Sequence, residues 1–283
     1  MKAYLQLVRA PAALTVLGDT VAGAAAAGNP LRGRRLLLPL SSAAFYWAGM
    51  ALNDWADREL DAVERPERPI PSGRISPNHA LAVAGGLTVT GLGLARAAGG
   101  RDTMKVAIPL AAAVWAYDTV LKKTAAGPLG MAACRTLDVL LGAGATRARS
   151  ALPSAVAVGG HTFGVTALSR GEVHGSSAAT AGAVLAGTAA TALTAATGAR
   201  SWRDRLGAVA FTGLYSAVVG RAQLDARNDP SAKTVRSATM AGIHGMVPLQ
   251  AALAARRGSL LGAAVVAAAL PVARKLSRKV SPT

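Results

Sequence analysis

Apolar stretches of the length needed to cross a lipid bilayer alternate with short charged segments along the whole chain. A helix needs about 20 predominantly apolar residues to cross a bilayer. The stretches fall near residues 10–28, 36–52, 77–98, 104–121, 127–146, 151–168, 177–198, 206–223, 234–255 and 258–273. Only Arg256-Arg257-Gly258 separates the last two. The pattern therefore predicts an all-α protein, a polytopic transmembrane bundle of nine to ten helices.

The pattern shows no soluble domain, long linker or internal repeat, so residues 1–283 are expected to form one integral membrane domain. The amino terminus resembles a secretory signal peptide in its Ala-rich run. However, Arg9, Pro11 and Asp19 interrupt that run, and many further stretches follow. We therefore expect the first stretch to be an uncleaved membrane span.

The composition supports a membrane protein and argues against a nucleic-acid-binding one. Charged residues make up 16% of the chain, against about 25% in a typical soluble domain. The net charge is nevertheless +17. The basic residues flank the apolar stretches, as is typical of loops that contact anionic headgroups. Since no aromatic-basic stacking pattern accompanies them, we expect the lipid bilayer as partner and no nucleic acid.

The distribution of basic residues predicts which loops share a membrane face. If the amino terminus is cytoplasmic and all stretches cross, 17 of the 31 Lys and Arg fall on the cytoplasmic side and 13 on the opposite side. This bias is weak but follows the positive-inside rule. The loops at 53–76, 169–175 and 225–233 then lie on the cytoplasmic side with Lys122 and Lys123. We expect a multi-pass protein of the cell (inner) membrane with its site facing the cytoplasm.

Four polar residues follow the uncharged segment 36–52: Asn53, Asp54, Asp57 and Asp61. If the helix continues by one or two turns, their side chains fall on one broad face, at ~100° per residue. Carboxylates that close together repel each other unless a cation lies between them, and hard oxygen ligands suit Mg²⁺. The alternative is a solvated helix end, although acidic residues there are unfavourable to the helix dipole.

A proline-rich basic segment comes next in the chain. Pro66, Pro69 and Pro71 prevent a regular helix, so they hold Arg65 and Arg68 on a stiff loop beside the carboxylates. Arginine suits bidentate contact with phosphate. Metal-binding carboxylates next to arginines therefore predict a diphosphate site.

Further basic residues follow the fourth stretch. Lys122 and Lys123 are adjacent, and a typical role for such a pair is to anchor a membrane helix. Arg135 lies inside a span, where a charge costs several kcal/mol unless it finds a partner or water. Asp138, three residues later, can pair with it, so a structural ion pair and a ligand contact both remain open.

These motifs together resemble the UbiA superfamily of intramembrane prenyltransferases over nearly the whole chain. The resemblance rests on Arg9-Ala10-Pro11, on the Asn53 to Asp61 motif with its Arg-Pro-Ile-Pro-Ser-Gly tail, and on Leu121-Lys122-Lys123 followed by Gly127. It implies a ring of helices around a central cavity. It also implies a prenyl diphosphate donor that enters from the lipid, Mg²⁺ held by two aspartate motifs, and an acceptor that attacks the allylic cation.

The second aspartate motif of that family is altered here. The corresponding segment, 166–175, reads TALSRGEVHG, and Glu172 is its only acidic residue. This departure makes the chain similar to the divergent EboC-like branch of the superfamily. Asp225 and Asp229 have suitable spacing but come two helices later, and Asp229-Pro230 is equally an ordinary helix stop.

The resemblance implies a membrane prenyltransferase, Mg²⁺-dependent, that transfers a prenyl group from its diphosphate to an acceptor that the sequence does not identify. As catalytic residues and metal ligands it indicates Asp54, Asp57, Asp61 and Glu172, with Asn53 as a further ligand. As substrate-binding residues it indicates Asn53, Arg65, Arg68, Lys122, Lys123 and Arg135. The alternative is a non-catalytic relative, a lipid- or metabolite-binding membrane component of a biosynthetic or export pathway. A secondary transporter would predict two related halves, which the sequence lacks.

Overall fold

The computed structural model describes residues 2–280, and the side chains of residues 2–269 and 271. Within these residues every regular element is helical, so the all-α prediction is confirmed. The α-helices are Lys2–Leu7 (α1), Leu17–Ala26 (α2), Leu37–Ala56 (α3), Arg58–Glu64 (α4), Pro77–Thr119 (α5), Gly127–Ala143 (α6), Ala148–Ser169 (α7), Ala178–Ala196 (α8), Trp202–Tyr215 (α9), Arg221–Asn228 (α10), Ala232–Ala255 (α11) and Leu260–Val280 (α12). Four 3₁₀ turns, Ala10–Thr15 (η1), Gly33–Leu36 (η2), Leu121–Lys123 (η3) and Ala145–Arg147 (η4), and one π-helical turn, Ser216–Gly220 (η5), join them.

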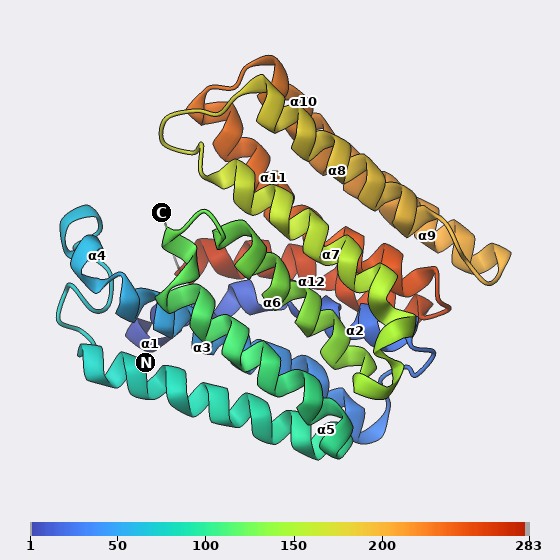
Figure 1. Ribbon diagram of the computed structural model, residues 1–283, viewed down its shortest axis with the longest axis horizontal. Coiled ribbons are helices and arrows are strands. Elements are labelled where there is room, and N and C mark those ends of the chain that lie inside the picture. The colour runs from blue at the N-terminus through green and yellow to red at the C-terminus, as the bar shows by residue number, and fades with distance from the viewer. Residues whose placement is uncertain (1, 281–283) are drawn as a thin grey trace.

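The long helix α5 is a hairpin of two helical arms. Gly100 adopts φ 66° and ψ −137°, a left-handed backbone conformation that glycine reaches without a Cβ clash. The chain therefore reverses at this residue, as Figure 1 shows at the lower right. The two apolar stretches that the sequence predicts, 77–98 and 104–121, correspond to the two arms.

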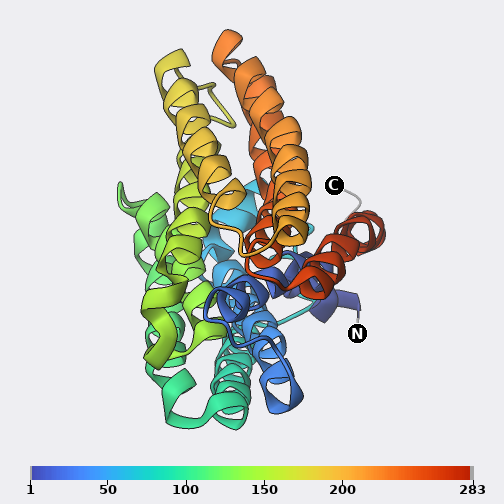
Figure 2. The same cartoon turned by 90° about the vertical axis from the view of Figure 1, so that its right-hand side faces the viewer.

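The helices form a closed ring. Each helix contacts the next one in the order α2, α3, α5, α6, α7 and α8. Helices α9 and α10 each contact both α8 and α11, and α11 contacts α2, which closes the ring. Figures 1 and 2 show the blue-to-green helices on one side of this ring and the yellow-to-orange ones on the other. The last helix, α12, packs outside the ring on α11 and η1. The predicted ring around a central cavity is therefore confirmed.

Small residues permit the closest crossing in the ring, between α2 and α6. A Cβ atom on Gly23 would lie 1.8 Å from the carbonyl oxygen of Val139, and one on Gly142 would lie 2.1 Å from that of Thr20. Neither distance is physically possible, so the two backbones can approach this closely only because both positions are glycine. Small residues at helix contacts are the usual packing device in membranes.

The loops that follow alternate helices gather at one end of the ring, which we call the motif end: residues 57–76, 120–126, 170–177 and 229–231. Lys122 on η3 pairs with Asp57 across 2.7 Å. The Ser176 amide donates to the carbonyl of Pro230 at 2.9 Å, and Arg170 donates to the carbonyl of Thr124. The four segments that the charge distribution assigns to one side therefore lie together.

Four helical segments are long and apolar enough to cross a membrane by length and composition: Gly33–Ala56, Pro77–Thr119, Ala145–Ser169 and Ala178–Ala196. The second has 43 residues, which is sufficient for both arms of the α5 hairpin because a helix rises about 1.5 Å per residue. Two shorter apolar helices, Ala10–Ala26 and Leu260–Ala269, accompany them.

Candidate active site

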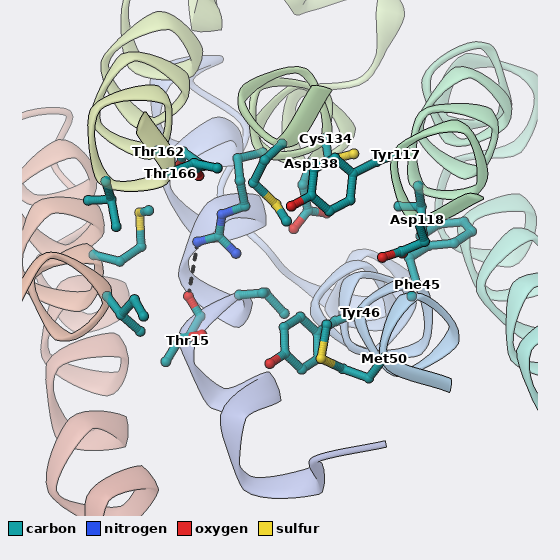
Figure 3. Close-up of a pocket in the computed structure, with 18 of the residues that line it drawn as sticks. Thr15, Phe45, Tyr46, Met50, Tyr117, Asp118, Cys134, Asp138, Thr162 and Thr166 are labelled. Atoms are coloured by element: carbon teal, nitrogen blue, oxygen red, sulfur yellow. Dashed lines mark hydrogen bonds between the residues drawn. The ribbon is translucent and has the colours of Figure 1, made fainter. Parts of the chain in front are cut away.

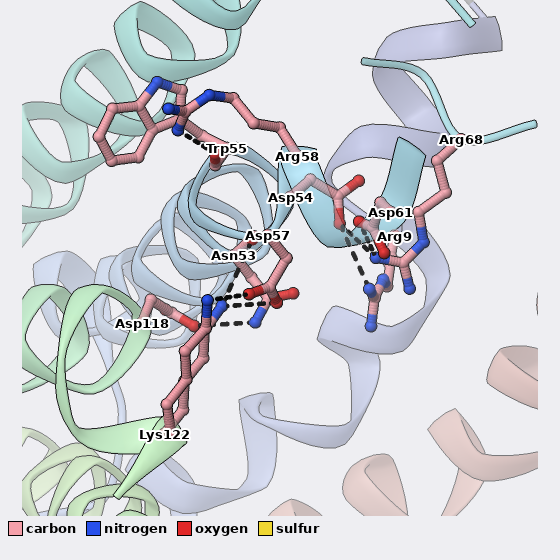
Figure 4. Close-up of polar contacts among 11 residues, drawn as sticks. Arg9, Asn53, Asp54, Trp55, Asp57, Arg58, Asp61, Arg68, Asp118 and Lys122 are labelled. Carbon is pink, nitrogen blue, oxygen red and sulfur yellow. Dashed lines mark hydrogen bonds and ion pairs between the residues drawn. The ribbon is translucent and has the colours of Figure 1, made fainter. Parts of the chain in front are cut away.

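The acidic motif spans a break between two helices. Helix α3 ends at Ala56, and Asp57 leaves the helical conformation with φ −96° and ψ 7° before α4 begins at Arg58. Helical hydrogen bonds still cross this position, from the Asp57 amide to Asn53 and from the Asp61 amide to Asp57, and the four polar residues divide into two groups by their contacts. Figure 4 shows Asp54 and Asp61 on one side and Asn53 and Asp57 on the other.

Arginines hold the first group, which we call the arginine group: Arg9, Asp54, Asp61 and Arg68. The Arg68 guanidinium lies 2.6 Å from Asp61 and 3.4 Å from Asp54. Arg9 approaches the same oxygen of Asp54 at 3.4 Å. Asp54 and Asp61 are only 3% and 2% exposed. Buried carboxylates require such partners, because an unpaired buried charge is costly.

Lysines hold the second group, which we call the lysine group: Asn53, Asp57, Asp118, Lys122 and Lys123. Lys122 and Lys123 lie 2.7 and 3.5 Å from the two oxygens of Asp57. The Asn53 amide donates to Asp118 at 3.2 Å. The structure therefore brings the two lysines to the acidic motif, as the diphosphate-site prediction requires.

The proline-rich loop places its two arginines differently. Arg68 is half-buried against the carboxylates, whereas Arg65 is exposed, and the described residues include no hydrogen-bond or ion-pair partner for its side chain. The loop folds back on itself, since the Ile75 amide donates to Pro69 and Ser72 donates to the carbonyl of Arg68. Arg65 is thus free to contact a ligand that approaches from outside the ring.

Arg9 and Asp118 are site residues that the sequence assignment omitted. Arg9 has a φ of 46°, and a residue other than glycine in this region is strained. Its motif with Pro11 contributes to the family resemblance, but only the structure shows its contact with Asp54. Asp118 follows Tyr117 in the segment that the sequence analysis singled out for its lysines. Its side chain is only 3% exposed and lies beside Asn53. The one signal for it in the sequence was a carboxylate inside an apolar stretch.

Inside the ring, next to the lysine group, lies a cavity of about 510 Å³. Most of its wall is apolar, with Phe45, Met50 and Tyr117 among the lining residues shown in Figure 3. Its polar lining residues include Asp118, Glu172 and, further inside, Asp138. A mostly apolar cavity with few polar groups is the usual form of a ligand site.

Glu172 lies in the turn after α7 and lines this cavity. The turn is fixed by its backbone, because Arg236 donates to the carbonyl oxygen of Glu172 at 3.0 Å. Among the described residues, the Glu172 carboxylate has no hydrogen-bond or ion-pair partner. It can therefore meet a ligand in the cavity.

Arg135 also lines the cavity, but its ion-pair partner differs from the expected one. Its guanidinium pairs with Asp19 on α2 across 3.1 Å, whereas Asp138, the candidate partner in sequence, accepts a hydrogen bond from Ser42 at 2.5 Å. Two aspartates from different helices converge on the same region, which no single-helix argument can anticipate. Arg135 thus has a structural role, because its ion pair joins α6 to α2. Since it also lines the cavity, it can contact a ligand as well.

The side-chain oxygens at the motif end are of the chemical type that binds Mg²⁺, but they do not surround one common point. Across residues 2–280, no three His, Cys, Asp or Glu side chains lie close enough together to hold a metal ion. The carboxylates are instead occupied by arginine and lysine. However, Oδ1 of Asp57 is buried without a hydrogen-bond partner, with the Lys123 ammonium 3.5 Å away, and carboxylate oxygens beside phosphate-binding cations are typical Mg²⁺ ligands.

Asp225 and Asp229 are exposed on α10 and at its end, and neither lines the cavity. Asp229 accepts hydrogen bonds from the amide and hydroxyl of Ser231 at 3.2 and 3.1 Å. These contacts are typical of a residue that ends one helix, here α10, and precedes the start of the next, α11.

Comparison with known proteins agrees with this architecture. The model of the UbiA prenyltransferase family matches residues 14–279. Digeranylgeranylglyceryl phosphate synthases of Methanopyrus kandleri and Ignicoccus hospitalis are 45% identical over 96 residues and 42% identical over 127 residues. These matches cover 34% and 44% of this chain and 35% and 40% of the relatives, so the chain matches well under half the length of these curated relatives.

Solved structures show the same fold. A digeranylgeranylglyceryl phosphate synthase structure superposes with a TM-score of 0.65 at 16% identity, covering 92% of this chain and 98% of that one. A UbiA homolog from Archaeoglobus fulgidus bound to GPP and Mg²⁺ superposes with a TM-score of 0.58 at 15% identity, covering 84% and 99%. With the family match over nearly all of its length, this chain belongs to the UbiA prenyltransferase family.

Proposed function

We propose that the protein is a Mg²⁺-dependent membrane prenyltransferase that transfers a prenyl group from a prenyl diphosphate to an acceptor. The observation that carries this proposal is the position of the arginine and lysine groups beside an apolar cavity. Clustered cations next to carboxylates suit a diphosphate and its metal, and the apolar wall suits a prenyl chain. The UbiA homolog bound to GPP and Mg²⁺ supports the same donor class.

The residues of the two groups would divide the work of holding the donor. Arg9, Arg68, Lys122 and Lys123 would turn from their carboxylate partners to the diphosphate oxygens, with Arg65 approaching from the loop. Asn53, Asp54, Asp57 and Asp61, with Glu172 from the turn after α7, would then be left to hold the metal. Bound Mg²⁺ would supply the positive charge that stabilises the departing diphosphate.

Fixed cations are most effective here because the negative charge on the leaving group grows as the allylic C–O bond breaks. Lys122 already lies at the site, 2.7 Å from Asp57 and 3.5 Å from the backbone carbonyl of Asn53, so only its side chain would have to turn to reach the diphosphate. The mostly apolar cavity wall would protect the allylic cation from water, which otherwise competes with the acceptor.

The membrane face of the site is also a proposal. The motif end faces the cytoplasm in this assignment, since its loops carry the larger share of Lys and Arg. Thiol labelling with an impermeant reagent tests it in variants without Cys134 that carry Ser72→Cys or Val173→Cys. Both positions should label from the cytoplasmic face, and labelling from opposite faces would contradict a site built from both loops.

We further propose that the chain belongs to the divergent EboC-like branch, on the basis of the single acidic residue in 169–175. The relatives reported above carry another name, digeranylgeranylglyceryl phosphate synthase. A non-catalytic lipid- or metabolite-binding relative is the alternative that this altered loop favours.

Radiolabelled prenyl diphosphates of several chain lengths test the proposal directly. Incubated with the purified protein, Mg²⁺ and a native lipid extract, at least one should transfer its label to an extract component. Tight binding of a donor without transfer or release of diphosphate would support the non-catalytic alternative instead.

A further inference from the structure

The end of the ring opposite the motif end carries a large excess of positive charge, and we call it the basic end. Its segments, 28–36, 96–105, 144–150, 197–205 and 256–259, hold 13 Lys and Arg but only two carboxylates, Asp102 and Asp204. Among the side chains that the structure describes, none of these 13 cations forms an ion pair. Figure 1 shows two parts of this end at the right, the α5 reversal and the turn between α8 and α9.

The basic end lies at the level of a lipid headgroup layer. Helix α3 joins it to the motif end and has 20 residues, which make about 30 Å of helix. The hydrocarbon core of a bilayer has the same thickness, about 30 Å. Trp202 is exposed at the start of α9, and the Arg203 guanidinium lies 5.4 Å from its ring. Since tryptophan is enriched at membrane interfaces, this pair places segment 197–205 among the headgroups.

Three arginines from three segments meet around the turn that ends α2. We call them the basic cradle: Arg35, Arg147 and Arg200. Arg147 donates to the carbonyl of Ala27 at 3.0 Å. A Cβ atom on Gly28 would lie 3.7 Å from a terminal nitrogen of Arg200. Arg35 donates to the carbonyl of Gly142 at 2.7 Å, and it is close enough to Arg147 for the two charges to repel each other.

Helix capping accounts for only part of this arrangement. Arg35 and Arg147 each contact the carbonyl end of a helix, where a cation is favourable. However, a guanidinium has five N–H groups. The contacts of the described residues use one on Arg35, one on Arg147 and none on Arg200. Because Arg147 and Arg200 are also exposed, the cradle retains donors for an acceptor from outside the protein.

Asp102 attracts Arg35 but does not neutralise the cradle. Its Oδ1 accepts from the amide and the hydroxyl of Thr146 at 2.7 and 2.6 Å. Three guanidiniums beside one carboxylate leave an excess of positive charge, and the cations repel each other unless an anion lies between them. Arginine suits planar bidentate contact with phosphate, so the cradle fits a phosphate group.

The surroundings of the cradle indicate that this phosphate belongs to a lipid. Leu193 on α8 and Leu206 on α9 lie on the two helices that flank Arg200, and their side chains are 67% and 61% exposed. In a membrane these surfaces face acyl chains, which a free anion lacks. Basic pockets between membrane helices are also known to bind anionic headgroups.

We propose that the basic cradle binds the phosphate of an anionic phospholipid whose acyl chains lie along α8 and α9. Arg147 and Arg200 contact the phosphate oxygens, while Arg35 adds attraction from its half-buried position. The bound lipid joins the turn after α2 to the turn after α8, and it stabilises the folded protein because it binds only that form. The cradle lies at the other end of the ring from the diphosphate-binding residues, so this inference does not rest on the proposed function.

Lipid titration of the purified full-length protein in detergent tests the proposal. Native mass spectrometry measures the dissociation constants of dioleoyl phosphatidylglycerol and dioleoyl phosphatidylcholine, which share their acyl chains but differ in net charge. The wild type should bind phosphatidylglycerol at least about tenfold more tightly, equivalent to ~1.4 kcal/mol. Arg147→Gln and Arg200→Gln should each lower that preference at least about threefold, because each removes charge-assisted hydrogen bonds to the phosphate.

Arg149→Gln is the matched control. Arg149 follows Arg147 closely in α7, is exposed, and has no hydrogen-bond or ion-pair partner among the described residues. Its substitution removes the same charge from the same end and should leave the lipid preference unchanged. An equal loss in Arg149→Gln and Arg147→Gln would overturn the cradle in favour of diffuse attraction. If Arg147→Gln fails to fold without its contact to Ala27, Arg200→Gln decides, because it removes no described hydrogen bond.

Two other outcomes would overturn the proposal. One is equal affinity of the wild type for the two lipids. The other is displacement of phosphatidylglycerol by excess inorganic phosphate at constant ionic strength, which would show a site for a free anion. Neither measurement involves a prenyl diphosphate, so failure here would leave the proposed function intact. Absence of diphosphate release would likewise leave the lipid site intact.

Discussion

At the end of α3 every carboxylate of the motif pairs with a basic side chain, whereas the turn after α7 brings a single carboxylate, Glu172, to the cavity without a described side-chain partner. The first region is internally neutralised. Arg9, Arg68, Lys122 and Lys123 offset Asp54, Asp57 and Asp61. The second region is held by contacts that leave the Glu172 carboxylate free: Arg236 donates to the Glu172 carbonyl, Arg170 to the Thr124 carbonyl and the Ser176 amide to the Pro230 carbonyl.

The difference indicates that the two regions contribute at different stages. Paired charges at the end of α3 contribute to the stability of the protein before any ligand arrives, and they can exchange partners when a diphosphate and its metal bind. Glu172 contributes nothing comparable to the ligand-free protein, so its contribution is expected in the reacting complex. Each prediction below tests one side of this comparison.

The largest effect is expected on stability, from Arg68→Ala. This change leaves Asp61 and Asp54 buried with a partner removed, and breaking a buried ion pair costs about 3–5 kcal/mol. The Tm in detergent should fall clearly. Arg65→Ala, the control on the same loop, removes an exposed side chain without described partners and should change stability by less than about 0.5 kcal/mol. Equal Tm shifts in the two variants would contradict the internal neutralisation.

Glu172→Gln should lower turnover at least ~100-fold, a typical cost of losing one electrostatic stabiliser of a transition state. Binding of the prenyl diphosphate should change far less, because the arginine and lysine groups carry it. Calorimetry and diphosphate release measure the two quantities separately. Glu64→Gln, an exposed carboxylate at the end of α4, is the control. Unchanged turnover in Glu172→Gln would show that the turn after α7 has no catalytic role.

Asp57→Asn should weaken Mg²⁺-dependent binding of a prenyl diphosphate by at least about tenfold, roughly 1.4 kcal/mol. The substitution removes a hard anionic ligand without changing shape, and Asp54→Asn should act in the same direction. Calorimetry with and without Mg²⁺ separates loss of the metal from loss of the phosphate contacts. Prenyl diphosphate binding as tight as in the wild type in both variants would assign the carboxylates a purely structural role.

The smallest effect is expected from the double variant Asp225→Asn and Asp229→Asn. The asparagine Oδ1 can still accept from the Ser231 amide and its Nδ2 can donate to the Ser231 hydroxyl, so stability should change by less than about 0.5 kcal/mol. Turnover should stay within twofold of wild type, about 0.4 kcal/mol. A loss as large as that in Glu172→Gln would identify α10 as the second metal-binding region.

The helical bundle was predictable from the sequence because apolar length alone determines which segments can cross a bilayer, whereas its closure into a ring was implied only by the family resemblance. The reversal inside α5 was also predictable, since charged residues around 101 separate two apolar stretches. The pairing of Lys122 with Asp57 followed in outline from placing their loops on one side. These three features depend on local sequence and on the membrane side of each loop, and both can be derived from a single sequence.

Contacts between distant helices were not predictable in this way. Arg135 has an aspartate three residues away in sequence, yet it pairs with Asp19, because the glycines at the α2–α6 crossing bring α2 into reach. The division of the acidic motif into two groups depends on partners from other segments: Arg9, Arg68 on the proline-rich loop and Lys122 on η3. The hydrogen bond from Ser42 on α3 to Asp138 on α6 is likewise visible only once these helices are packed.

The most direct test of the central claim is the release of diphosphate from prenyl diphosphates by the purified wild-type protein, measured with native lipid extract in Mg²⁺ and after chelation of the metal. The account predicts release from at least one donor length in Mg²⁺, and loss of that release on chelation or in the Asp54→Asn and Asp57→Asn double variant. Release that continues unchanged with the chelator, or no release from any donor, would contradict the claim that paired carboxylates and cations at the end of α3 activate a prenyl diphosphate.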